Sequence, residues 1–367
     1  MHNRLDPHNI TSLCPVCYGV VRGRLYKKQW ELRIRKTCPV HGEFDSLVDP
    51  DAGFVDVLQP LGRHNNHFQT LFFNVTDHCN IRCKYCYYPL TEKTPNPMID
   101  RLVREASETN YVILMTGGEP TSRKDLPEVV AALKKSHVVA MLTNGIALDD
   151  PDLVKRLADS GMTMEISKQG QTTRLFLASF SLHLPKFNGP ENHARKLAAL
   201  ENIRSQGMVI EDVMFSVESL EDIPEAIKCI RELKTRALTW RIRGPGNIWA
   251  EHSAPQILYT SQMFNRLREM ANAEGVRFEI LGGMDNTLYT LSVRYDNLNL
   301  RLIQWPNEQN VVIEDLAGKG PYQKANNGII ENVVYAGLVN QGMAKGWLNG
   351  VKLTGEQPTR PTDFMRR

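Results

Sequence analysis

Three cysteines in the run CNIRCKYC, Cys79, Cys83 and Cys86, have the spacing that points most directly to chemistry. They follow the apolar residues 71–75, which predict a strand leading into one short loop. Iron–sulfur clusters are held by cysteine thiolates, as a rule one for each iron. Three thiolates can therefore hold three irons of a [4Fe–4S] cluster and leave the fourth iron without a protein ligand. An open coordination site of this kind indicates catalysis rather than electron storage.

A zinc knuckle is the alternative interpretation, because closely spaced cysteines often bind zinc. Zinc needs a fourth ligand, and the neighbouring His78 would require a strained loop to supply it. The sequence downstream favours the cluster. Residues 116–120 read TGGEP after the apolar run 111–115, and residues 142–145 read LTNG after the apolar run 138–141.

The CxxxCxxC spacing, followed in order by GGEP and TNG motifs after predicted strands, resembles the radical S-adenosylmethionine (radical SAM) superfamily. The resemblance implies that SAM chelates the open iron through its amino and carboxylate groups. It further implies reductive cleavage of SAM to a 5′-deoxyadenosyl radical, with an electron donor such as flavodoxin or ferredoxin. The residues implied in SAM binding are Tyr85 at the adenine, Gly117, Gly118, Glu119 and Pro120 near the amino group, Asn144 with Gly145 beside the adenosine, and Ser181 near the ribose or carboxylate.

Two of these assignments have competitors. Asn144 and Gly145 would also suit a simple strand-to-helix turn. Ser167 competes with Ser181, because residues 162–167 and 175–184 predict an extra hairpin inserted into the repeating unit. Ser181 is favoured, since the helix that follows it matches the layout of the family.

Residues acting on the substrate are not assigned by any motif, and four remain as candidates. His183 follows Ser181 at a strand end, where a lone histidine more often packs or lines the substrate than donates a proton. Arg241 and Arg243, at the sixth strand end, suit a carboxylate or phosphate, or else a solvated rim. Glu218, just past the fifth strand, has the same two interpretations.

A separate metal site is predicted near the N-terminus. Cys14, Cys17, Cys38 and His41 lie in CPVC and CPVHG motifs on either side of residues 20–34, whose alternation predicts a hairpin. This layout is typical of a zinc ribbon or a rubredoxin-like module. Four such ligands form a closed tetrahedral site, which favours structural zinc, with a redox iron as the alternative. So short a module has too little core to fold without metal.

The rest of the chain alternates between strand and helix patterns, which predicts a parallel sheet with helices outside it. The resemblance implies a partial (β/α)6 barrel, with its chemistry at the carboxyl ends of the strands. We expect a zinc-ribbon or rubredoxin-like module at 1–60, the barrel at 68–275 and an extension at 276–367. Short alternating stretches at 278–281, 288–295, 298–304 and 310–313 predict that the extension is small, β-rich and antiparallel, then irregular.

Composition narrows the class of protein. A net charge of +3 over 367 residues is too small to indicate a dedicated nucleic-acid binder. The sequence contains no run of eighteen apolar residues and begins without the apolar segment of a signal peptide. Six of the seven cysteines lie in metal-type spacings, which predicts a cytoplasmic protein rather than a disulfide framework. The seventh, Cys229, is expected in the core.

An N-terminal CPxC…CPxHG module ahead of the cluster motif is similar to the group that includes tetraether lipid synthase and methanopterin-type methylases. The resemblance implies carbon–carbon bond formation or methylation at an unactivated carbon of a small-molecule or lipid-like substrate. Two alternatives stay open: modification of a peptide or tRNA docked by the basic ribbon, and a non-catalytic iron–sulfur protein with a regulatory role. The basic residues are Arg22, Arg24, Lys27, Lys28, Arg33, Arg35 and Lys36.

Overall fold

The structure is a computed structural model. It describes residues 10–17, 19–54, 70–83, 95–107, 112–168, 170–244, 257–282, 290–304, 309–310, 322–325 and 328–330. The predictions for Tyr85, Cys86 and the strand end at 311–313 lie outside these residues.

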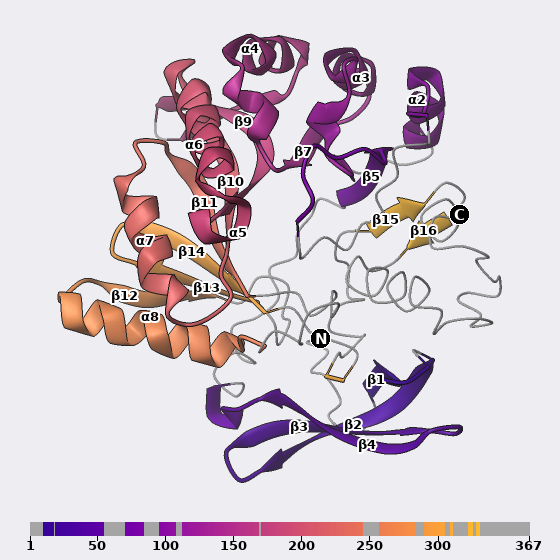
Figure 1. The fold of residues 1–367 in the computed structure, drawn as a ribbon, viewed down its shortest axis with the longest axis vertical. Helices are drawn as coiled ribbons and strands as arrows, with labels where there is room; N and C mark the ends of the chain where they lie inside the picture. The colour runs from indigo at the N-terminus through magenta and orange to yellow at the C-terminus, as the bar shows by residue number, and fades with distance from the viewer. Residues whose placement is uncertain are drawn as a thin grey trace.

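Six parallel strands build the wall of the barrel, as the alternating pattern predicted (Figure 1). In register, Met115 pairs with Phe73 on one side and with Met141 on the other, and Met141 pairs with Ala178. All four side chains are buried, so the central strands are apolar where they meet the helices. In sheet order the strands are β5 (Thr70–Thr76), β6 (Val112–Gly117), β7 (Val139–Thr143), β9 (Gln171–His183), β10 (Met208–Ser216) and β11 (Ala237–Arg243).

Helices cover the outer face of this sheet (Figure 1). Their apolar sides contribute, with the strands, to one continuous core. In the described part of the chain, no helix has the length and apolar character needed to cross a membrane. The helices are α2 (Ile99–Ser107), α3 (Leu126–Leu133), α4 (Pro151–Ser160), α5 (Pro185–Asn188), α6 (Pro190–Ser205), α7 (Asp222–Glu232) and α8 (Thr260–Glu274).

Local sequence signals fix the ends of α4. The Asp150 side chain accepts a hydrogen bond from the backbone of Asp152, and Pro151 occupies the first helical position. Gly161 ends the helix with φ +111°, a backbone conformation that residues with a Cβ rarely adopt. The two ends of α4 are thus set by residues next to it in the sequence.

The inserted hairpin is formed by β8 (Thr163–Lys168) and the first part of β9, which pair antiparallel. Ser167 lies exposed in this arm, where its hydroxyl is 3.0 Å from that of Thr172. The exposed arm therefore does not bring Ser167 to the strand ends, whereas Ser181 lies further along β9 opposite Met214 of β10.

The C-terminal strands extend the main sheet at both edges. β12 (Phe278–Gly282), β13 (Thr290–Tyr295) and β14 (Leu298–Ile303) pair antiparallel as predicted, but β14 also joins β11 in parallel. The extension is thus continuous with the barrel wall. At the opposite edge, β15 (Tyr322–Ala325) pairs in parallel with β5 and antiparallel with β16 (Gly328–Ile330).

The N-terminal module is a four-stranded antiparallel sheet, larger than the single predicted hairpin. It lies beside the barrel as a separate layer (Figure 1). A small apolar cluster on its own strands includes Ile10, Leu25 and Ile34. Its strands are β1 (Ile10–Leu13), β2 (Val20–Lys28), β3 (Glu31–Cys38) and β4 (Gly42–Asp49).

The end of β4 docks against the first turn of α8. Asp49 is only 2% exposed, and its carboxylate lies 3.5 Å from the backbone nitrogen of Ser261. Gln304 accepts from the Thr260 backbone at 3.0 Å and donates to the Val48 carbonyl at 3.4 Å. The Phe54 and Phe264 rings pack with centroids 5.1 Å apart. The module is therefore joined to the barrel by an apolar contact and a buried polar one.

Asp49 gives this contact a pH dependence. Burial raises the pKa of Asp49 to about 6, so the folded state holds the proton more tightly than the unfolded chain. Stability from this group is complete at low pH and falls as pH rises through the folded pKa. Asp49→Asn should therefore gain stability relative to wild type by roughly 1.5 kcal/mol between pH 5 and 7.5, measured by urea unfolding.

The matched control is Asp45→Asn on the same strand. Arg33 and Arg35 contribute to a pKa of Asp45 below its usual value, so its difference from wild type should stay flat over this pH range. An equally flat profile for Asp49→Asn would show that the buried carboxyl carries no penalty.

Candidate functional site

The predicted cluster loop begins where β5 ends. Cys79 and Cys83 are partly buried in the loop after Thr76, and Cys86 lies outside the described residues. The loop emerges at the carboxyl end of the first parallel strand, the end at which α/β sheets bind ligands. The GGEP and TNG segments follow the next two strands in the sheet, β6 and β7.

Two glycines let the backbone of β6 approach the cluster loop. Gly118 donates its backbone N–H to the Thr76 carbonyl at 2.7 Å, and Glu119 donates to the His78 carbonyl at 2.6 Å. A Cβ at Gly117 would lie 2.0 Å from the Thr76 oxygen, and one at Gly118 would lie 2.0 Å from the His78 oxygen. Only glycine fits at either position, because real Cβ contacts never become this short.

The Glu119 carboxylate joins the end of β6 to the end of β7. It accepts hydrogen bonds from the Thr121 backbone and hydroxyl, from the Thr143 hydroxyl at 2.7 Å, and from the Asn144 backbone at 2.6 Å. Burial raises the pKa of Glu119, and these donors oppose that rise. One oxygen of the Glu119 carboxylate accepts three of these hydrogen bonds, and the other accepts only the one from the Asn144 backbone. The second oxygen is therefore the atom that can still bind a ligand.

Asn144 reaches back to the cluster loop. Its amide donates to the Asn80 side chain at 2.8 Å and lies 3.9 Å from the Cys79 sulfur. Gly145 follows with φ +77°, and a Cβ there would lie 1.9 Å from the Phe180 ring. Asn144 therefore contacts the cluster loop as well as forming a turn.

Arg123, which the sequence motifs did not single out, binds the backbone on both sides of the same loop. Its side chain is almost wholly buried, donating to the Val75 carbonyl at 2.7 Å and the Pro97 carbonyl at 3.1 Å, and pairing with Asp125. A buried guanidinium that binds two carbonyls fixes the chain on each side of the cluster loop. It lies three residues past Pro120, so the GGEP motif is the only sequence signal near it.

Lys196 is the second residue that sequence reasoning missed. It is fully buried on α6, and its ammonium donates to the Ser181 carbonyl at 2.9 Å and to His183 Nδ1 at 3.2 Å. The signal was available, because Lys196 falls on the apolar face of α6, three, four and seven residues before Ala199, Leu200 and Ile203.

This contact decides the state of His183. An ammonium has only donors, so we assign Nδ1 as an acceptor and place the ring proton on Nε2. Burial lowers the pKa of His183 well below its usual value, and the charges of Lys196, Arg243 and His193 lower it further. His183 is thus a neutral imidazole at the end of β9, suited to donating a hydrogen bond and unsuited to acting as a general acid.

Charged groups of both signs surround the cysteines, and Glu119 is the anionic one. Burial raises the pKa of Cys79 and Cys83, while the charge of Arg82 opposes the rise for Cys79 and those of Lys196 and Arg243 oppose it for Cys83. A cluster held by thiolates carries negative charge, and cationic side chains compensate for it. The residues present therefore fit an iron–sulfur cluster.

The remaining candidates lie on two neighbouring strands. Arg241 and Arg243 lie opposite Met214 and Ser216 of β10, and Arg241 Nε lies 2.7 Å from a carboxylate oxygen of Asp212. Glu218 lies beyond β10, where its backbone N–H donates to Asp222 at 2.8 Å. The arginines are therefore part of the barrel wall, whereas Glu218 belongs to the turn that precedes α7.

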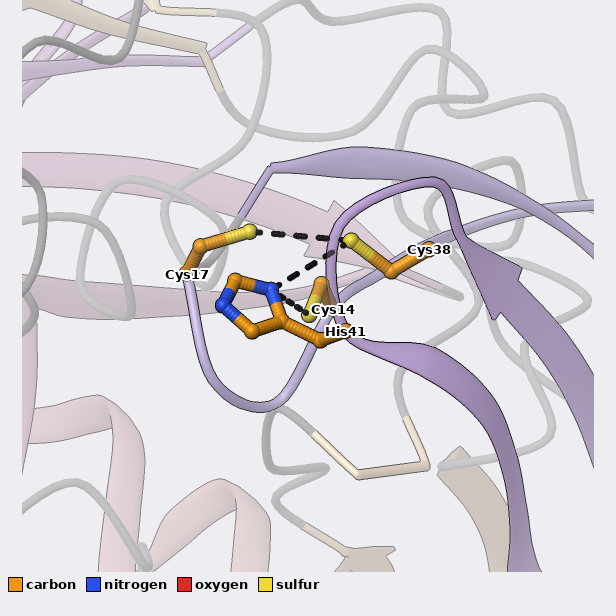
Figure 2. A group of neighbouring side chains, drawn as sticks. All are labelled: Cys14, Cys17, Cys38 and His41. Carbon is orange, nitrogen blue, oxygen red and sulfur yellow. Dashed lines mark hydrogen bonds between the residues drawn. The ribbon is translucent and has the colours of Figure 1, made fainter.

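The N-terminal ligands converge as predicted (Figure 2). The His41 Nδ1 atom lies 3.6 Å from the Cys14 sulfur and 3.5 Å from the Cys38 sulfur, and the sulfurs of Cys17 and Cys38 are 4.0 Å apart. Zinc bond lengths of about 2.3 Å to sulfur and 2.1 Å to nitrogen give tetrahedron edges of about 3.6 to 3.8 Å. The four side chains therefore have the spacing of a closed tetrahedral site.

The CPVHG turn favours a thiolate. Backbone N–H groups of Val40 and His41 overcome the effect of burial and lower the pKa of Cys38 to about 6, whereas burial raises the pKa of Cys17 to about 11. Cys229, in contrast, is partly buried against the barrel core on α7 and belongs to neither site.

Gly118→Ala should remove most of the iron bound after anaerobic reconstitution, because the new Cβ would displace the cluster-loop backbone at His78. Iron content per chain measures this. Gly53→Ala is the control, since a Cβ there meets only a side-chain oxygen of Asp51 at 3.3 Å. Full iron occupancy in Gly118→Ala would show that the close approach is not required.

The N-terminal site should hold one zinc ion, which Cys38→Ser removes while iron in the barrel remains. Elemental analysis of both metals in wild type and variant tests this. Visible absorption of an iron–thiolate centre in the isolated module, in place of zinc, would contradict it.

Comparison with known proteins gives two family matches. A model of the radical SAM superfamily matches residues 73–230, and a model of the HMPTM N-terminal zinc ribbon domain matches residues 7–50. The second match covers all four N-terminal ligands, and the first covers the cluster loop, GGEP and TNG.

Named relatives differ in what they act on. The 7,8-dihydro-6-hydroxymethylpterin dimethyltransferase of Methanocaldococcus jannaschii is 28% identical over 187 residues, 41% of this chain and 37% of that protein. The PqqA peptide cyclase of Gluconobacter oxydans is 27% identical over 173 residues, 45% of this chain and 46% of that protein. This chain thus spans less than half the length of either relative.

Among solved structures, Streptococcus suis SuiB bound to precursor peptide SuiA is similar with a TM-score of 0.48 and 14% identity, over 74% of this chain and 61% of that chain. A similarity this low supports no conclusion about function. The two family matches show that the chain contains a radical SAM domain, at residues 73–230, and an N-terminal zinc ribbon domain of the HMPTM type, at residues 7–50.

Proposed function

We propose that the chain is a radical SAM enzyme that abstracts hydrogen from an unactivated carbon of a small-molecule or lipid-like substrate. The cluster, held by Cys79, Cys83 and Cys86, and SAM would together supply a 5′-deoxyadenosyl radical. The observation that carries the proposal is the convergence of three strand ends. The cluster-loop backbone lies against Gly117 and Gly118, and Asn144 contacts Cys79.

The chain's residues would hold and orient SAM at these strand ends. Gly117 and Gly118 give backbone access beside the second oxygen of Glu119, which suits an amino group. Asn144 and Ser181, from the third and fourth parallel strands, would line the adenosine, with Tyr85 at the adenine and Pro120 shaping the turn. His183 Nε2–H is then a donor at the same edge, on a ring whose pKa is lowered by burial and by the charge of Lys196.

An RNA substrate docked on the ribbon is less well supported. Arg33 and Arg35 both pair with Asp45, Arg33 also pairs with Glu31, and Arg35 with Glu43. Paired guanidiniums are less available to phosphates. A peptide substrate remains the second candidate, because one of the relatives is named as a peptide cyclase. Zinc is favoured in the ribbon, with a structural role.

Reductive cleavage of SAM tests the proposal directly. Anaerobically reconstituted protein, given dithionite and SAM, should form 5′-deoxyadenosine and methionine, measured by mass spectrometry. Cys83→Ala should abolish both products, because a cluster ligand is lost. Cys229→Ala is the matched control and should retain them, since Cys229 lies on α7 away from the cluster loop.

A protein that holds the full cluster and still forms no 5′-deoxyadenosine would instead support the non-catalytic alternative.

A further inference from the structure

The barrel wall opposite the helices carries a group of arginines. On β11, Trp240 and Ile242 pack into the core shared with the helices, so Arg241 and Arg243 lie on the other face. On β14, Leu300 and Leu302 belong to the same core, which places Arg301 on that other face as well.

Strand register brings two of these arginines together. Arg241 and Arg301 are direct partners across the parallel β11–β14 pair, and Ser292 of β13 is the next partner in the row. Side chains at partner positions lie roughly 5 Å apart at Cβ, and like charges so close repel each other. The chain keeps both arginines on one face, which requires a source of negative charge.

Asp212 supplies part of that charge and orients Arg241. Ser179 donates to one oxygen of Asp212 at 2.5 Å, and Arg241 Nε lies 2.7 Å from the other, an ion pair outside hydrogen-bond angles. The Asp212 side chain is 5% exposed, whereas that of Arg241 is 28% exposed. Asp212 thus engages Nε, while part of the Arg241 side chain stays accessible.

Several charged groups meet in this part of the barrel. Glu211 is the other carboxyl beside the pair, and burial together with Asp212 raises the pKa of Glu211 although Arg241 and Arg301 oppose this. The guanidiniums of Arg241, Arg243 and Arg301 thus lie on one face of neighbouring strands, with the carboxyls of Asp212 and Glu211 close to Arg241.

The group lies within the barrel, close to the predicted site of chemistry. Arg243 lies level with Ser216 and His183 in the register, and its charge acts on Cys83. Arg241 is the next residue on the same face, about 7 Å along the strand from Arg243. A molecule bound at Arg241 would therefore occupy the barrel interior beside the strand ends that carry the cluster loop.

We propose that the substrate is an acidic molecule, and that its oxyanion group, a carboxylate or a phosphate, binds the terminal amino groups of Arg241. Arg301 and Arg243 add positive charge on either side, and the Ser179–Asp212 pair holds the guanidinium in place. Guanidinium forks match carboxylate and phosphate geometry. The inference rests on the proposed function, since it names the substrate class of the same site.

Binding of simple oxyanions tests the inference without the substrate. Reconstituted enzyme with SAM is titrated with inorganic phosphate and, separately, with succinate, at constant ionic strength set by sodium chloride, and thermal stability is measured. At least one of the two should raise the melting temperature saturably, which identifies phosphate or carboxylate as the source. Arg241→Gln should weaken that apparent affinity roughly tenfold or more.

Matched variants make the result specific. Arg277→Gln, an exposed arginine paired with Glu279, should bind as wild type. Arg241→Lys keeps the charge but not the fork, and should fall between wild type and Arg241→Gln. If Arg241→Gln does not fold because Asp212 is left buried without its partner, the double variant Asp212→Asn/Arg241→Gln removes both charges and takes its place.

Absence of saturable binding by either oxyanion, or equal binding by the Gln variant, would overturn the inference. Formation of 5′-deoxyadenosine without substrate is recorded in the same preparations. If that product forms while oxyanions do not bind, the substrate class is wrong and the proposed function stands. If it does not form at all, the proposed function itself fails.

Discussion

Close backbone contact between the first two parallel strands is the constraint on which the site depends. The carbonyls of Thr76 and His78, at the start of the cluster loop, receive the backbone N–H groups of Gly118 and Glu119. This contact leaves no room for a Cβ at positions 117 and 118. Glu119 then continues the linkage to β7 through Thr143 and Asn144. A loop that must present thiolates is thereby fixed by main-chain bonds that no side-chain motion can release.

Two buried cationic side chains, those of Lys196 and Arg123, lie next to the site. Lys196 lies at the strand ends with two acceptors, the Ser181 carbonyl and His183 Nδ1, around its ammonium. Arg123 binds two main-chain carbonyls that flank the cluster loop. Cations buried this deeply are costly unless they are paired. The cysteines nearby would hold a negatively charged cluster, and the positive charge of these side chains would offset it. Burial and the charge of Lys196, with those of Arg243 and His193, lower the pKa of His183, so the site favours hydrogen bonding by a neutral imidazole over proton transfer.

The N-terminal module contacts the barrel at the start of α8, a helix that lies far from the cluster loop in the sequence. Its four ligands close a site at one end, while Asp49 and Phe54 at the other meet the first turn of α8. A ribbon with a small apolar cluster gains rigidity from metal at one end and from docking at the other.

Motif spacing and periodicity predicted much of the fold and of the candidate sites. Sequence alone singled out Cys79, Cys83, the glycines at 117 and 118 and the four ribbon residues, because metal binding and close approach each require one residue type. Alternation of strand and helix likewise predicted the six parallel strands, since burial on both faces leaves a continuous apolar signal. Ser181 was preferred over Ser167 on family layout and stays a prediction, while Ser167 lies in the exposed hairpin. The tertiary structure alone decided the rest. Lys196, Arg123 and the Asp212–Arg241 pair gain meaning from neighbours 13 to 48 positions away, and the joining of β14 to β11 depends on pairing between distant strands. Sequence pattern reports only local periodicity, whereas partnership between buried charges is set by which strand ends the fold brings together.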